Sequence, residues 1–222
     1  MKDDLVLALE QSLTEGTKDI AANIAQMGID AILKDGAFQG IPIVANVASV
    51  YKIGHSIKEL HYIKKLAQFV FALNYGVETE EQRQYYISRV LEDRDRANKE
   101  LEYILVLIDR YIQFSKADML AKLYLAYLRK EITWDSFSVY SEVVDRLMPG
   151  DFEELEKGDQ QSVSDSRVSD HLLRLNAMGL MVAHVKDFSV ATTVGSISIP
   201  AQTEKDYEVT AFGKTFLECL SK

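Results

Sequence analysis

The side chains that most often carry out chemistry in proteins are sparse in this sequence and poorly spaced for a shared site. The histidines are His55, His61, His171 and His184, and Cys219 is the single cysteine. His55 and His61 are six residues apart, a poor spacing for two ligands on one helix, and no HExxH or CxxC motif is present. The sequence therefore predicts no metal site and no internal disulfide.

Catalytic and cofactor-binding motifs are also missing from the chain. No phosphate-binding G-x-x-x-x-G-K-[ST] run, no dinucleotide-binding G-x-G-x-x-G run and no nucleophile motif G-x-S-x-G occurs. The acidic runs Glu78–Glu81 and Glu92–Asp95 are typical of solvated helix starts, where carboxylates favour the helix dipole. We therefore expect no catalytic residue and no cofactor, and a protein that is not an enzyme.

One helix near the C-terminus carries a polar surface that suits recognition. Its apolar stripe consists of Val168, Leu172 and Leu175. Outside this stripe lie the candidate contact residues Ser166, Arg167, Asp170, His171 and Arg174. The spacing of the three basic residues places them on one side of the helix, where they could contact phosphates or bases. The alternative is a soluble surface paired with Asp170, and this second interpretation is favoured.

The charge distribution argues against a nucleic-acid partner. The chain has a net charge of −9, and residues 150–222 hold 12 acidic and 7 basic side chains. Nucleic-acid binding draws affinity from the phosphates that Lys and Arg neutralise. A protein partner is therefore favoured, while nucleic acid stays a disfavoured possibility.

A second candidate segment, Gly36–Tyr51, contains sixteen consecutive uncharged residues. It is shorter than the ~20 apolar residues of a spanning helix and contains a Gly–Pro break. The favoured interpretation is a core helix that buries Ile41, Ile43, Val44 and Val47. The alternative is a segment that leaves the bundle to enter a membrane or bind a partner. The basic residues that would then suit anionic headgroups are Lys52, Lys58, Lys64 and Lys65.

These candidate residues need a helical framework, which the periodicity of apolar residues predicts for residues 1–148. Thr79 and Gln82 have the spacing of a capping box, and Gly76 suits a left-handed helix cap. Pro149-Gly150 predicts a boundary between this helical bundle and a second domain, residues 149–222. The predicted fold class is mainly α, with an α+β domain at the C-terminus.

Strands are expected only after about residue 179. Met181–Val185 and Val190–Ile199 are rich in β-branched residues. The connection between strands is predicted either at Gly195–Asp206 or in a turn at Lys186–Ser189. Thr210 is predicted to open a final helix.

The pattern Leu172, Leu175, Met178-Gly179-Leu180, followed by Tyr207–Thr210, Gly213 and Phe216, resembles the winged-helix regulator superfamily. The resemblance covers about 60 residues. It implies that the helix before Gly179 is a recognition helix and that the Tyr207 segment returns from the wing. The few basic residues on the presumed reading face depart from a DNA-binding pattern.

A second resemblance covers the middle of the chain, from about Ile41 to Leu147. The segments Gly40–Val44, Ile57–Leu66 and Lys116–Phe137 resemble an uncharacterised group of small bacterial helical proteins found near phage-defence genes. The shared motifs are apolar, so this resemblance implies a context and no mechanism.

Together these features predict a non-enzymatic protein-interaction or regulatory protein, in a bacterial antiviral defence context that the second resemblance implies. A lone cysteine and a start without a secretion signal favour the cytoplasm. Two alternatives stay open: a DNA-binding winged-helix transcriptional regulator, and a membrane-acting effector that uses residues 36–51.

Overall fold

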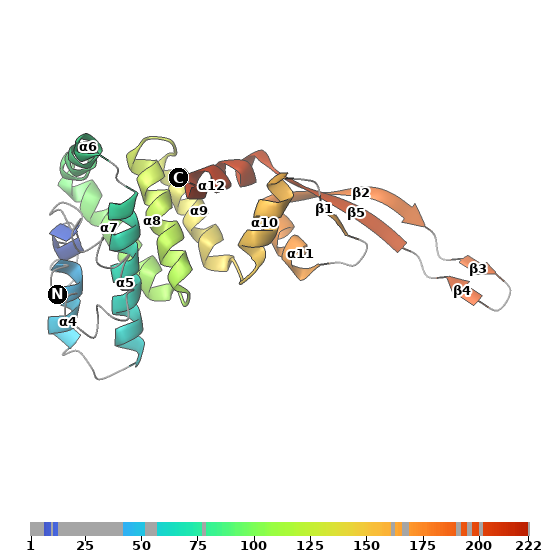
Figure 1. The fold of residues 1–222 in the computed structure, drawn as a ribbon, viewed down its shortest axis with the longest axis horizontal. Helices are drawn as coiled ribbons and strands as arrows, with labels where there is room; N and C mark the ends of the chain where they lie inside the picture. Colours follow the sequence, from blue (N-terminus) through green and yellow to red (C-terminus); the bar gives the residue numbers. More distant parts are fainter. Residues whose placement is uncertain are drawn as a thin grey trace. The chain divides into compact units, whose positions relative to one another are not determined.

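The described part of the protein is mainly helical, with short antiparallel strands near its C-terminal end (Figure 1). The computed structural model describes residues 7–9, 11–12, 42–51, 57–76, 79–160, 163–165, 169–189, 192–194, 197–199 and 202–221. The chain divides into two compact units, the first reaching to Asp145 and the second covering Arg146–Ser221.

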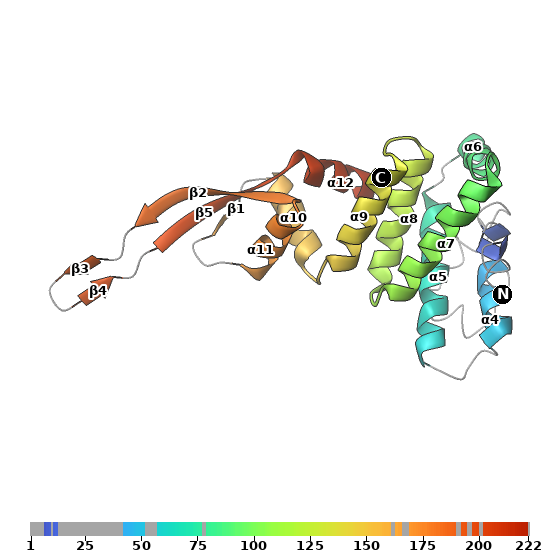
Figure 2. The same cartoon turned by 180° about the vertical axis from the view of Figure 1, so that it is seen from behind.

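The first unit contains helices and no strand among its described residues, as the apolar periodicity predicts. Its labelled helices are α4 (Pro42–Tyr51), α5 (Ile57–Tyr75), α6 (Glu80–Leu91), α7 (Arg94–Arg110), α8 (Phe114–Leu128) and α9 (Trp134–Arg146), whose last residue lies past the division. Figure 2 shows the same helices from behind.

Side-chain caps fix where several of these helices begin. The predicted capping box of α6 is present: Gln82 N–H donates to Thr79 Oγ1 at 3.2 Å, and Thr79 N–H donates to Gln82 Oε1 at 3.4 Å. Asp93 accepts from the backbone N–H of Arg96 at the start of α7. Each cap satisfies a backbone donor that has no partner within its helix.

A buried lysine satisfies the opposite end of α7. Lys65, on α5, is 2% exposed, and its Nζ donates to the carbonyls of Asp109 and Tyr111. Burial lowers the pKa of Lys65, and the nearby Asp109 carboxylate partly opposes that shift. The helix carbonyls left without intrahelical partners thus receive a cation at the negative end of the helix dipole.

Two other basic side chains also donate to backbone carbonyls near the ends of helices. Lys116 Nζ donates to the carbonyl of Asp145 at 2.7 Å, near the end of α9. Arg129 Nη2 donates to the carbonyl of Gly76 at 2.7 Å, directly after α5. Gly76 itself lacks the left-handed conformation predicted for it. Instead, close packing favours glycine at this position, because a Cβ there would collide with Leu125 Cδ1.

Aromatic side chains fill the core between α7, α8 and α9. Trp134 lies 4.8 Å from Phe137 and 5.3 Å from Tyr127, measured between ring centroids. The Tyr127 hydroxyl donates to the buried Glu100 carboxylate at 2.6 Å. Burial and this hydrogen bond raise the pKa of Tyr127 to about 12. The hydrogen bond supplies the partner that a buried carboxylate requires.

The uncharged segment of the sequence lies partly in α4. Ile43 and Val44 are completely buried, and the Ile43 N–H donates to Ser12 Oγ at 2.8 Å. Ile41 and the side chain of Val47 lie outside the described residues. Searched over the described residues, no helix has both the length and the apolar character needed to cross a bilayer.

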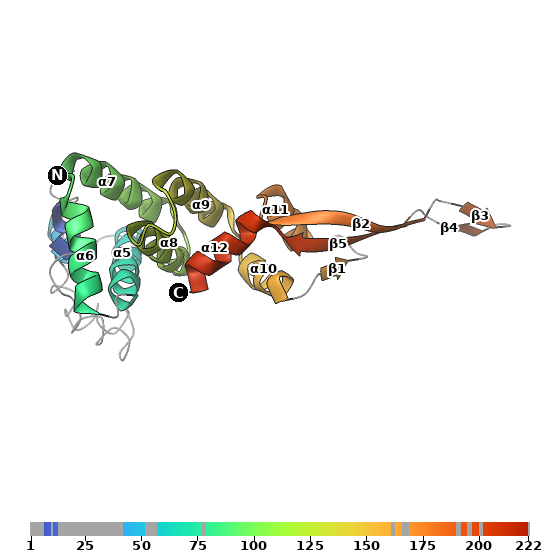
Figure 3. The ribbon, with the colours of Figure 1, turned by 90° about the horizontal axis from the view of Figure 1, so that it is seen from above.

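The described residues of the second unit form helices and antiparallel sheets (Figure 3). Its elements are α10 (Asp151–Gln160), β1 (Val163–Asp165), α11 (Asp170–Ala177), β2 (Met181–Ser189), β3 (Thr192–Val194), β4 (Ile197–Ile199), β5 (Gln202–Val209) and α12 (Ala211–Ser221). The larger sheet has the order β1-β5-β2, and β3 pairs with β4.

Three expectations for the strands were wrong. Strand β1 lies before residue 179; it has only three residues, too few for an alternating pattern, and forms because Val163 pairs opposite Tyr207. Residues Lys186–Ser189 form no turn but continue β2, with an irregular register between Val185 and Asp187. The predicted strand Val190–Ile199 contains two short strands that pair with each other.

The larger sheet has one face in the core of the second unit. Met181 lies opposite Val209, and Ala183 opposite Tyr207; Met181 and Tyr207 are almost fully buried. The next pair, Val182 and Glu208, points to the exposed face, as the two-residue period of a strand requires. Thr210 opens α12 by accepting from the backbone N–H of Gly213, as predicted.

Replacing Val44 with aspartate should destabilise the protein by several kcal/mol, because the carboxylate would be buried without a partner or forced into its neutral form. Thermal unfolding followed by circular dichroism measures the effect. Val106→Asp is the control, since Val106 is 53% exposed. An unchanged melting temperature for Val44→Asp would contradict the burial of α4.

Candidate functional site

The candidate recognition residues lie on and before α11. Asp170 is the first residue of α11, and its side chain is exposed. His171 and Arg174 are partly exposed, by 40% and 35% of their side chains. Ser166 and Arg167 lie outside the described residues. Three of the five candidates are therefore described, and they share one helix.

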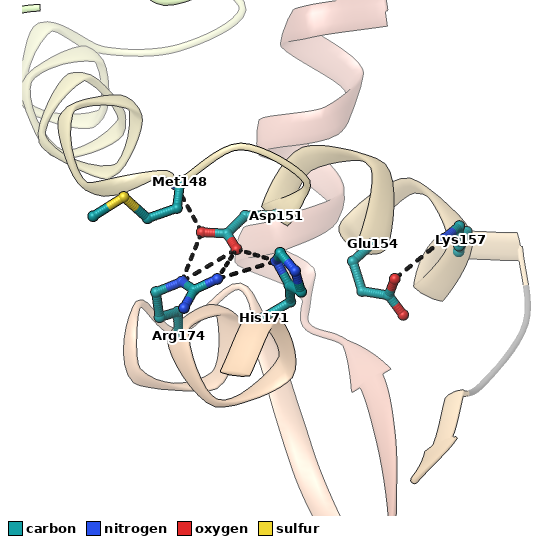
Figure 4. A network of polar contacts seen from close by, with 6 residues as sticks. All are labelled: Met148, Asp151, Glu154, Lys157, His171 and Arg174. Atoms are coloured by element: carbon teal, nitrogen blue, oxygen red, sulfur yellow. Dashed lines mark hydrogen bonds and ion pairs between the residues drawn. The ribbon is translucent and has the colours of Figure 1, made fainter. Parts of the chain in front are cut away.

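His171 and Arg174 bind a carboxylate that the sequence did not single out, that of Asp151 (Figure 4). Arg174 binds Asp151 with two nitrogens: Nη2 donates to Oδ1 at 2.7 Å, and Nε donates to Oδ2 at 3.1 Å. His171 Nδ1 lies 2.7 Å from Asp151 Oδ1. The backbone N–H of Met148 donates to Oδ2 at 2.8 Å. This arrangement connects the first turn of α10 to α11.

The geometry around His171 favours one tautomer. Its Nδ1 lies within hydrogen-bond distance of both Asp151 Oδ1 and Arg174 Nη2, at 2.7 and 3.0 Å. A bare Nδ1 lone pair would face the carboxylate oxygen, whereas a protonated Nδ1 donates to it. Because a carboxylate only accepts hydrogen bonds, we assign the proton to Nδ1.

The Asp151 carboxylate is held in its charged form. Its side chain has no exposed surface, and this burial alone would raise its pKa. Hydrogen bonds from Arg174, the Met148 backbone and His171 outweigh burial, so the pKa of Asp151 lies below its ordinary value. The same pairing raises the pKa of Arg174. A buried charge with this many donors is stabilised where an unpaired one would not be.

Gly150 makes room for this network. Its φ of +87° lies in the left-handed region that side chains disfavour. In addition, a Cβ at position 150 would lie 2.9 Å from Cε1 of His171. Gly179, which follows α11, also has a positive φ of +75°, but a Cβ there would meet nothing within 4 Å. A side chain at Gly179 would therefore strain only the backbone, whereas a side chain at Gly150 would strain the backbone and also clash with His171.

The network decides which side chains α11 presents to solvent. The buried face of the helix carries Leu172 and Leu175. Its exposed positions are Asp170, Leu173, Asn176 and Ala177, of which Leu173 is 43% exposed. None of these four residues is basic. The two basic residues of α11 are instead directed to Asp151.

The adjoining strand β2 also exposes apolar side chains. Val182 is 38% exposed and Val185 is 64% exposed. The register puts Val185 opposite Lys205, on the same face as Ala183 and Tyr207. Tyr207 is buried and Val185 is exposed, so the part of this sheet face that is covered by other residues ends between Tyr207 and Val185.

Sequence reasoning missed Asp151 because its partners are distant along the chain. His171 and Arg174 follow it by 20 and 23 positions, and no helical or strand period connects such residues. The one local signal is Pro149-Gly150-Asp151, in which a carboxylate begins a helix directly after a left-handed glycine. That pattern predicts a helix start but names no partner.

Among the described residues, no group of three His, Cys, Asp or Glu side chains could hold a metal ion. In the other candidate segment, Ile41–Val47, the candidate residues Ile43 and Val44 are described, and both are buried in the first unit. The structure thus brings His171 and Arg174 into one site with Asp151.

No protein-family model, curated protein or solved structure matches this chain.

Gly150→Ala should destabilise the protein more than Gly179→Ala. Both place a Cβ on a left-handed residue, which costs about 1–2 kcal/mol. Only Gly150→Ala also pushes against His171 and disturbs its bond to Asp151. Urea unfolding of the two variants tests the difference, and equal losses would show that the network tolerates the displacement.

Asp151→Asn should lower the free energy of unfolding by about 2–3 kcal/mol at neutral pH, because charged hydrogen bonds are lost. The folded pKa of Asp151 lies below the ordinary value of 3.8. Its stabilisation is therefore complete above about pH 4 and declines as the pH falls through the folded pKa.

Urea unfolding of wild type and Asp151→Asn between about pH 7 and pH 3 measures this difference. Asp170→Asn is the matched control, since Asp170 is an exposed carboxylate in the same unit. A difference that stayed constant to the lowest pH would mean that the Asp151 charge does not stabilise the fold.

Proposed function

We propose that this chain is a non-enzymatic protein-interaction or regulatory protein, and that its second unit is a winged-helix-like module that binds a protein partner through α11. The observation that carries the proposal is the exposed face of α11, which presents Leu173 and no basic side chain. His171 and Arg174, two of the three cationic groups that would contact phosphates, bind Asp151 instead.

The order of elements supports the winged-helix-like assignment. Helix α11 ends at Ala177, just before Gly179, and is followed by β2, a β3–β4 hairpin, β5 and α12. Strands β2 and β5 pair along most of their length, and β3 pairs with β4 between them in the sequence. This is the order of recognition helix, wing and closing helix that the sequence pattern implies.

Charge supports a protein rather than a nucleic-acid partner. Residues 150–222 hold 12 acidic and 7 basic side chains, and one of the basic ones, Arg174, is bound to a buried carboxylate. Nucleic acid would be held mainly by neutralised phosphates, which this surface offers few groups to contact. Exposed apolar residues such as Leu173 and Val185 suit a protein interface better.

Affinity capture from the native host tests the proposal with three forms of the full chain: wild type, Leu173→Asp and Val139→Asp. Leu173 and Val139 are similarly exposed, at 43% and 51%, so both variants should fold. We expect a protein that wild type and Val139→Asp recover and that Leu173→Asp recovers at least about tenfold less, as for an interface hot spot.

Fluorescence anisotropy with duplex DNA at physiological salt discriminates the regulator alternative. We expect no sub-micromolar binding. Sub-micromolar binding that Arg167→Glu together with Arg174→Glu abolishes would overturn the proposal in favour of a DNA-binding regulator. A partner recovered equally by all three forms would exclude the α11 face as its binding site.

A further inference from the structure

Four large apolar side chains are exposed at one end of the first unit. Ile57 is 90% exposed, Leu60 41%, Ile112 79% and Phe114 38%. We call these four residues the apolar patch. With roughly 180 Å² for each side chain, they present about 450 Å², the size of the largest patch on a typical monomer.

His61, on α5, contacts two members of this patch, Ile112 and Phe114. His61 Nε2 lies 2.6 Å from the carbonyl oxygen of Ile112, and the His61 and Phe114 rings lie 4.7 Å apart between centroids. Ile57 and Leu60 precede His61 on α5 by four and one positions, so Ile57 lies one helical turn away. The patch therefore joins the start of α5 to the connection between α7 and α8.

Part of the patch lies at the start of α5. In Figures 1 and 2 the first turns of α5 extend beyond the adjoining ends of α7 and α8. Its most exposed member, Ile57, is the first residue of α5. Projecting side chains of this kind suit insertion into a soft surface better than docking of a second helix.

Basic side chains flank the patch on the same helix. Lys58 is exposed and Lys64 is half-buried, with the partly exposed His61 between them. Lys65, beside them, is buried against the end of α7. Among the described residues, the nearby acidic side chains are the half-buried Glu59 and Asp118 and the exposed Asp109. The exposed end of α5 therefore combines large apolar tips with nearby cations.

We propose that the apolar patch, with Lys58 and Lys64, is a docking surface for an anionic lipid bilayer. Two copies of the patch would together bury about 900 Å² of these side chains, an area at the small end of protein–protein interfaces. Anionic headgroups match the flanking lysines, while the acyl boundary accepts the isoleucines. The patch is separate from α4, whose Ile43 and Val44 are buried.

The net charge of −9 does not prevent this contact. At physiological ionic strength charges are screened within about 8 Å, so the local lysines matter more than distant carboxylates. Each isoleucine that becomes buried in the bilayer should raise the partition coefficient by about tenfold or more. The surface concerns the first unit alone and is independent of the α11 face.

Vesicle co-sedimentation of the full chain tests the proposal, with vesicles of phosphatidylcholine alone and of phosphatidylcholine mixed with phosphatidylglycerol. The test variant is Ile57→Glu together with Ile112→Glu. The control is Val106→Glu together with Val139→Glu, which changes the same number of charges at exposed apolar positions of the same unit. Melting temperatures of both variants should stay near that of wild type.

We expect wild type and control to bind the anionic vesicles, with at least about tenfold weaker partitioning of the test variant. Binding should fall on vesicles of phosphatidylcholine alone and in Lys58→Glu. No sedimentation of wild type would overturn the proposal, and so would equal losses in test and control variants. Capture of a protein that depends on Ile57 and Ile112, without vesicle binding, would assign the patch to a protein partner instead.

Discussion

The second unit depends on the hydrogen bonds that the buried carboxylate of Asp151 accepts. This carboxylate receives donors from Arg174, His171 and the Met148 backbone, and so connects the start of α10 to α11. A carboxylate without exposed surface is tolerated only when its oxygens are satisfied in this way. Its demand for cations sets the rotation of α11, and that rotation leaves Leu173 facing solvent.

The need of the Asp151 carboxylate for cations also affects which side chains α11 can present to solvent. A recognition helix that reads nucleic acid presents its arginines to phosphates or base edges. Here the arginine of α11 serves its own unit, and the exposed face has acidic, amide and apolar side chains. One buried acidic residue thus binds both basic side chains of α11.

The first unit meets a related constraint with basic side chains that are buried or half-buried. Lys65, Lys116 and Arg129 each donate to backbone carbonyls near the end of a neighbouring helix. Each contact satisfies a polar group that packing would otherwise leave without water, and each connects one helix to the end of another. Where these contacts and the aromatic core end, at the first turns of α5, apolar residues such as Ile57 remain exposed.

By itself the sequence determined the features that depend on neighbouring residues. The 3.6-residue period predicted helices throughout the described residues before Pro149, and the spacing of Thr79 and Gln82 predicted a capping box that is present. Only the tertiary structure decided the pairing of β1 with β5 and the partner of Arg174. Both are contacts across more than twenty residues, which no local period encodes, because they exist only after the chain has brought those residues together.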